Sequence, residues 1–114
     1  GFQYNFLSTV DAVFHESQHV DQYDLVERYN RGQIARTNPN YFAARIFAAN
    51  LNNFGYISPF DGAPLPAYEN QPAEIDARYA GATAADAAYH KYVVAPRRPA
   101  PLRAANANQT ACVA

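Results

Sequence analysis

Two histidines and one glutamate near the start of the chain have the spacing of a zinc-binding helix. They form the pattern His15-Glu16-x-x-His19. On an α-helix, side chains four residues apart lie on one face, so two neutral imidazoles can bind one Zn²⁺. Glu16 is then placed to take a proton from a water molecule that the metal activates. With three histidines and four glutamates in 114 residues, shuffled sequences would contain this pattern roughly 0.003 times, so chance is a poor explanation.

A catalytic zinc site needs a third protein ligand, because such sites have three protein ligands and one open position. Beyond the motif helix the candidates are Asp61, Glu69, Glu74, Asp76 and His90. Asp61 fits an ordinary turn, and Glu69 precedes a helix, where a solvated side chain is the usual outcome. Glu74 is expected in the first turn of a rigid helix, which holds a ligand better than a loop does. Its alternative role is a favourable first-turn charge paired with Arg78.

We therefore favour Glu74 as the third ligand. His90 lies sixteen residues further on, about 24 Å along the same helix, and cannot share its metal. Position 25 is leucine and the chain has no methionine, so the third histidine and the Met-turn of the metzincin class are both missing.

The hydrophobic pattern predicts a mainly α-helical domain of about three helices over residues 1–94. Apolar and polar residues alternate over the first positions, which favours a short extended arm over residues 1–8. Ser8 or Thr9 would cap a helix that continues to about Asn30.

Two further helices are expected. One is capped by Asn38, opens at Pro39 and ends near Gly55; the other opens at Pro72 and continues to about Val94. The proline-rich stretch between them, residues 56–71, is predicted to be a long loop without regular structure that borders the substrate.

Residues 95–114 are rich in proline, arginine and alanine, and we expect a disordered tail there. This stretch contains the one cysteine, Cys112, so an intramolecular disulfide is excluded. A net charge of −1 argues against a general nucleic-acid binder, and no apolar run is long enough to span a membrane. The compartment is left open by these features.

The chain resembles a family of small bacterial zincin-like domains over roughly residues 10–80. Members carry His-Glu-x-x-His-x-x-Gln and, some tens of residues later, Tyr-x-x-x-Pro-x-Glu-x-(Asp/Glu)-Ala. This chain has the first as residues 15–22 and the second as residues 68–77. The family includes metallopeptidase domains attached to secreted effectors, toxins and phage-like particles. Zincins commonly have a sheet before the motif helix, whereas fourteen residues precede His15 here.

The resemblance implies that His15, His19 and Glu74 bind zinc. Glu16 would be the general base, and Gln22 would support the site one turn beyond the second histidine. The chain would then be a secreted or delivered peptidase with peptide or protein substrates, within a longer polypeptide or larger assembly.

Three tyrosine or arginine side chains near the ligand helix could donate to the developing oxyanion: Tyr68, Arg78 and Tyr79. For the tyrosines, packing is the competing role. Two other functions stay open at the level of sequence. One is a degenerate zincin that serves as a binding or structural module, and the other is a toxin domain that hydrolyses a non-protein amide or ester.

Overall fold

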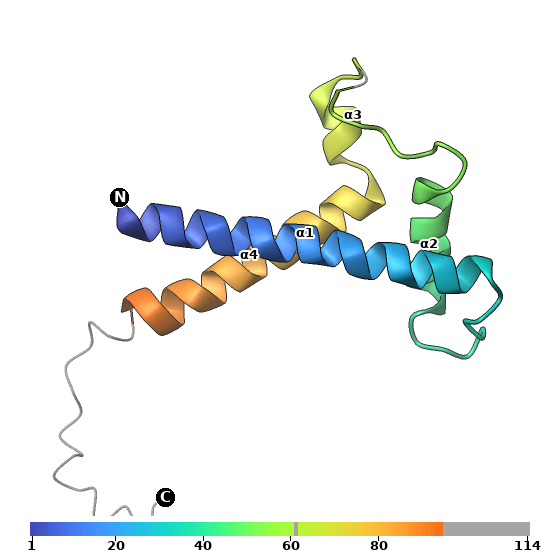
Figure 1. The fold of residues 1–114 in the computed structure, drawn as a ribbon, viewed down its shortest axis with the longest axis horizontal. Coiled ribbons are helices and arrows are strands. Elements are labelled where there is room, and N and C mark those ends of the chain that lie inside the picture. The colour runs from blue at the N-terminus through green and yellow to red at the C-terminus, as the bar shows by residue number, and fades with distance from the viewer. Residues whose placement is uncertain (61, 95–114) are drawn as a thin grey trace, which may run out of the picture.

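The computed structural model describes residues 1–60 and 62–94, and the regular structure in them is helical. In chain order the elements are α1 (Phe2–Asn30), α2 (Tyr41–Leu51), α3 (Leu65–Glu69), α4 (Pro72–Ala88) and a π-helical segment, η1 (Tyr89–Val94) (Figure 1). No strand occurs in this described part of the chain. The predicted mainly α class is therefore confirmed.

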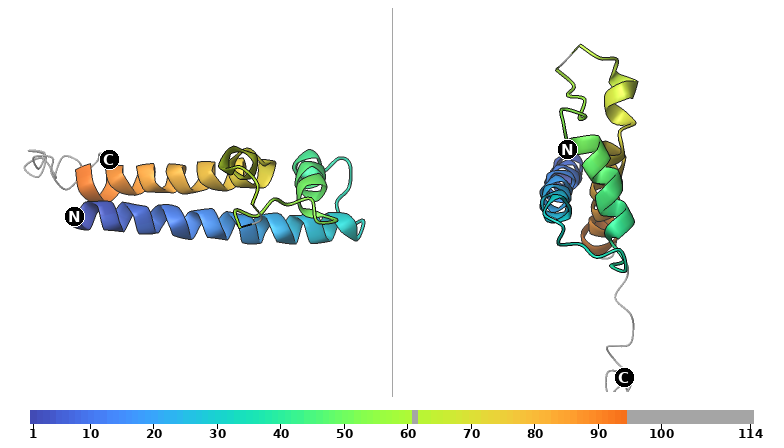
Figure 2. Two further views of the ribbon diagram at one scale, coloured as in Figure 1. Left: turned by 90° about the horizontal axis from the view of Figure 1, so that it is seen from above. Right: turned by 90° about the vertical axis from the view of Figure 1, so that its right-hand side faces the viewer.

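The helices form two layers. Helix α1 makes up one layer along the length of the molecule, and α4 and α2 follow one another in the other layer (Figure 2). Helix α4 runs antiparallel to the N-terminal half of α1, while α2 packs beside the C-terminal part of α1 (Figure 1). This arrangement places the middle of α1 against the first turns of α4.

Small residues let the two layers approach closely. The core contains Ala44, Ala48, Ala73 and Ala77, each at most 4% exposed. At Gly81 in α4, an added Cβ atom would lie 2.7 Å from the backbone oxygen of Asp11 in α1, closer than real Cβ contacts. This close helix contact is what allows a short carboxylate side chain on α4 to reach the histidines on α1.

The predicted N-terminal arm is wrong, because α1 already begins at Phe2. Phe2 and Phe6 are four residues apart and stack with ring centroids 6.3 Å apart, and Phe6 meets Tyr92 of η1 edge to face at 6.0 Å. A helix is the conformation that brings residues i and i+4 together in this way. The predicted cap at Ser8 or Thr9 is wrong for the same reason, since both lie inside the helix.

The boundaries of the other helices differ less from the predicted ones. Helix α2 begins at Tyr41 and ends at Leu51, inside the range expected for it. The stretch 56–71 contains the short helix α3, so the expectation of no regular structure is wrong for residues 65–69. The last predicted helix is present from Pro72 onward and continues as η1.

Asp61, Cys112 and the predicted tail over residues 95–114 lie outside the described residues. Within the part that is described, no helix is both long enough and apolar enough to cross a lipid bilayer.

Candidate metal centre

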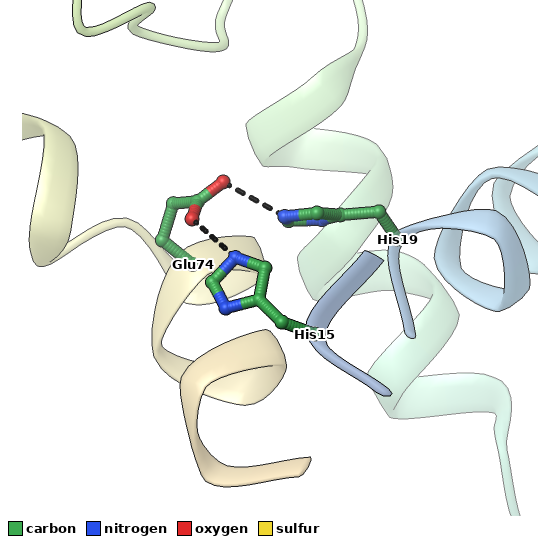
Figure 3. Close-up of side chains that lie close together, drawn as sticks. All are labelled: His15, His19 and Glu74. Atoms are coloured by element: carbon green, nitrogen blue, oxygen red, sulfur yellow. Dashed lines mark ion pairs between the residues drawn. The ribbon is translucent and has the colours of Figure 1, made fainter. Parts of the chain in front are cut away.

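The structure brings the three predicted metal ligands together. His15 and His19 project from one face of α1 toward Glu74, which sits in the first turn of α4 (Figure 3). His15 Nε2 lies 3.3 Å from Glu74 Oε1, and His19 Nε2 lies 3.0 Å from Glu74 Oε2. One ligand atom from each residue lies within 4.8 Å of the others, so the group could hold a metal ion.

Hydrogen bonds at Gln22 fix which nitrogen of His19 faces the centre. The amide nitrogen of Gln22 donates to the Ala73 carbonyl oxygen at 3.0 Å, so its oxygen, Oε1, is the atom 3.0 Å from His19 Nδ1. An amide oxygen only accepts, so Nδ1 of His19 carries a proton. In the neutral imidazole, Nε2 then presents a lone pair to the carboxylate of Glu74.

Lone pairs that face one another at 3.0 Å repel unless a cation or a proton lies between them. A tetrahedral Zn²⁺ with bonds of about 2.0–2.1 Å places its ligand atoms about 3.3 Å apart. Each histidine has about this spacing from one carboxylate oxygen, at 3.3 Å to Oε1 and 3.0 Å to Oε2, and the three residues together have ligand atoms within 4.8 Å of one another. The donor set and its geometry therefore fit a metal ion.

Two tyrosines hold the carboxylate of Glu74, which is only 1% exposed. Tyr56 donates to Oε2 at 2.5 Å, and Tyr68 donates to Oε1 at 2.9 Å. Burial by itself raises the pKa of Glu74, but the two hydroxyl donors and the nearby imidazoles outweigh it and hold this pKa below 4.5. Glu74 is thus kept ionised and fixed in orientation, as a metal ligand must be.

The tyrosine hydroxyls remain donors in this setting. Burial is the main cause that raises the pKa of Tyr56 and of Tyr68, and the negative charge of Glu74 adds to it. Tyr68, considered above as an oxyanion donor, instead bonds to the ligand carboxylate. Tyr56 was missed by the sequence reasoning, because it lies in an irregular segment with no periodic spacing to the motif.

Gln71, the residue that precedes α4, holds the Tyr56 segment in place. Its side-chain amide nitrogen donates to the carbonyl of Ile57 at 2.7 Å, and its oxygen accepts from the Ile57 N–H at 2.7 Å and from Asn50 at 3.0 Å. Gln71 is 6% exposed, so these bonds are made away from solvent. They connect α2, the segment after it and the start of the ligand helix.

A second hydrogen-bond network supports His19 through Gln22, on the Nδ1 side of the imidazole. Gln22 also donates to Asp76 Oδ2 at 2.9 Å, and Gln18 donates to the same oxygen at 2.6 Å. Asp76 is therefore the anchor for two glutamines of α1 and lies outside the ligand set. This network gives a physical reason for the glutamine three residues after His19 and for the acidic residue two positions after Glu74.

Glu16 lies beside the centre and is exposed. It lines a hollow together with His15, and its charge contributes to the raised pKa of Tyr68. The role of Glu16 as the general base stays a prediction.

The remaining predicted residues lie elsewhere. Arg78 donates to the backbone oxygen of Glu69 at 2.6 Å, and Tyr79 is 73% exposed in a hollow between α2 and α4. His90 faces Asp86 at 3.5 Å, far along the same helix from Glu74. Neither His90 nor Glu69 is in the group. The spacing along the helix predicted this for His90, and a solvated side chain was the prediction for Glu69.

No family model, curated protein or solved structure matches this chain. The resemblance to zincin-like domains therefore stays a prediction. The case for a metal centre rests on the positions of His15, His19 and Glu74 and on the residues that hold them.

Proposed function

We propose that this chain is a zinc-dependent hydrolase that cleaves peptide bonds. The observation that carries the proposal is the convergence of His15, His19 and Glu74, with ligand atoms within 4.8 Å of one another. Two imidazoles and one carboxylate form a ligand set typical of catalytic zinc, and three protein ligands leave one position open for water or substrate.

Solvent access supports a catalytic site over a closed structural one. The side chains of His15 and His19 are 19% and 16% exposed, whereas Glu74 is 1% exposed. The centre is thus closed on the α4 side and reachable from the α1 side. Glu16 is exposed on α1 next to His15, where a base that serves a reaction at this centre has to be.

Each residue would have a distinct part in the reaction. A bound zinc ion would supply Lewis-acid activation of water and stabilise negative charge on the substrate carbonyl. Glu16 would take the proton of the attacking water and pass it to the leaving amine. Tyr56 and Tyr68 would keep Glu74 oriented, and Gln22 would hold the Nδ1 proton of His19.

A binding module in a larger assembly is the second candidate, favoured by apolar surface away from the centre. Phe42, Ile46, Ile75 and Tyr79 are between 49% and 73% exposed on α2 and α4. Exposed apolar residues that gather in this way often mark protein interfaces. Such a module would not need an exposed glutamate at the open side of the centre, so we place hydrolase first.

Metal content and cleavage of peptides together test the proposal. The purified chain, dialysed against zinc, should hold about one zinc ion per molecule by elemental analysis, and the His15→Ala variant should hold none. Glu16→Gln should retain the metal and lose cleavage of a peptide library, because the ligands remain while the base is gone.

Glu27→Gln is a matched control, since Glu27 is exposed on the same helix and pairs with Arg31 at 2.7 Å. It should keep both the metal and the activity. A folded chain that takes up no zinc would rule out the centre. Cleavage that persists in Glu16→Gln at the original rate would rule out the assigned base.

A further inference from the structure

A groove along α1 borders the candidate metal centre at His15. It has a volume of about 590 Å³, and its lining includes the apolar side chains of Leu7, Ala12 and Ala85 as well as the polar ones of Tyr4, Ser8, Asp11, His15 and Glu16. His15 belongs to both the groove and the candidate metal centre. A substrate chain that reaches the metal can therefore extend into this groove without crossing another element.

The walls of the groove are fixed by helix packing. Asp11 contacts Gly81 of α4 so closely that a Cβ atom there would lie 2.7 Å from the Asp11 backbone oxygen. Ala85, one turn further along α4, is a small side chain that leaves the space open. Asp11 is thus held at a defined position on the groove, with its backbone oxygen and its carboxylate oxygen Oδ1 both against Gly81.

The spacing along α1 relates Asp11 to the cleavage point. Asp11 precedes His15 by four residues, which is about 6 Å along the helix axis. An extended peptide advances about 3.3 Å per residue. A substrate side chain about two positions from the scissile bond would therefore lie beside Asp11.

The charge of the groove indicates what that side chain is. Asp11 and Glu16 contribute carboxylates, and no lysine or arginine is among the described residues that line it. Arg78 of α4 donates to the backbone oxygen of Glu69 and does not line the groove. A cationic side chain beside Asp11 would gain an opposite charge, whereas an acidic one would be repelled.

We propose that this groove binds the substrate chain next to the scissile bond and that Asp11 selects a lysine or arginine there. The inference rests on the proposed peptidase function and adds the substrate class. Asp11 is a specificity-determining residue in this proposal and has no part in the bond-breaking step.

The test compares two peptides that are identical except for lysine or norleucine two positions from the cleaved bond. Norleucine keeps the length of the side chain and removes the charge. The zinc-loaded chain should cleave the lysine peptide with a kcat/KM about three- to tenfold higher, mainly through KM, as expected for one partly solvated ion pair. Separate peptide pairs place the lysine two positions before or two positions after the cleaved bond. The pair that shows the preference gives the direction in which the peptide binds.

Asp11→Asn should abolish the preference by lowering kcat/KM for the lysine peptide toward that for the norleucine peptide. Asp21→Asn is the matched control, because it removes the same charge from an exposed position of α1 outside the groove and should keep the preference. Equal cleavage of the two peptides, or a preference that survives Asp11→Asn, overturns the inference while the peptidase function stands.

If no peptide is cleaved, the peptidase function fails, and the groove is then judged by binding. Fluorescence anisotropy with the labelled lysine and norleucine peptides measures this without turnover. Tighter binding of the lysine peptide that is lost in Asp11→Asn supports the groove, and equal binding overturns it.

Discussion

Replacing Gln22 by leucine tests whether the buried glutamine controls the metal centre through His19. Gln22 is 1% exposed and makes three hydrogen bonds, to His19 Nδ1, to the Ala73 carbonyl and to Asp76. Leucine has a similar volume but offers no partner to any of them. The imidazole would then be free to rotate or to change tautomer, so its Nε2 would no longer be held toward the centre.

The magnitude follows from these contacts. Loss of an outer hydrogen bond to a histidine ligand lowers metal affinity by about 10- to 100-fold, or about 1.4–2.8 kcal/mol. The free energy of unfolding of the metal-free chain should fall by about 2–4 kcal/mol, because the Nδ1–H group and the Ala73 carbonyl lose their partner in a buried place. Asp76 keeps its bond from Gln18 at 2.6 Å, which limits the loss.

The assay is a competition titration for zinc against a chromophoric chelator, combined with urea unfolding of the metal-free protein. Gln18→Leu is the matched control, because Gln18 donates to the same oxygen of Asp76 but does not contact His19. It should change zinc affinity by less than about threefold. If Gln22→Leu folds and binds zinc as tightly as the original chain, the argument that Gln22 orients the ligand is wrong.

Three further changes have defined outcomes. Tyr56→Phe removes a hydroxyl that donates to Glu74 at 2.5 Å and should lower the free energy of unfolding in urea by about 1.5–3 kcal/mol. Tyr68→Phe removes the longer hydrogen bond, of 2.9 Å, and should lower it by no more than that. Equal stability of both variants and the original chain would contradict this. For the metal-free chain, the pKa of Glu74 is lower in the folded state than the ordinary 4.5, so the stability from its charge is present above pH 4.5 and is lost as the pH falls through the folded pKa. The stability difference between the chain and Glu74→Gln should therefore shrink in urea titrations as the pH is lowered below 4.5, and a difference that grows in that range would contradict the sign. Gly81→Ala places a methyl group 2.7 Å from the backbone oxygen of Asp11. The clash should cost about 1–3 kcal/mol, which outweighs the gain of up to about 1 kcal/mol from helix propensity, so the thermal midpoint measured by circular dichroism should fall. A higher midpoint would show that the two helices separate freely.

The sequence by itself determined the parts of the centre that depend on local helix geometry. His15 and His19 face the same way because 3.6 residues per turn place positions four apart on one face. The supporting role of Gln22 was implied by the family resemblance, and its position one turn beyond His19 suits that role. Glu74 could be selected because Pro72 opens a helix and sets that glutamate in a rigid first turn.

Only the tertiary structure decided which side chains meet Glu74. Tyr56 lies eighteen residues before it in an irregular segment, and the bonds from Gln71 that hold this segment have no periodic signature. From its position in the sequence, Asp76 could be a metal ligand or could support one. In the structure it accepts hydrogen bonds from Gln18 and Gln22, and Gln22 in turn bonds to His19.

Tertiary contacts also decided where α1 begins. The residues from Phe2 to Phe6 alternate as a strand would, yet they also place two rings four residues apart, and the edge-to-face contact with Tyr92 of η1 favours the helix. A short window carries both patterns, and contacts between residues distant in sequence select one of them. Local spacing thus places His15 and His19 on one face of α1, and the packing of α4 against α1 brings Glu74 to them.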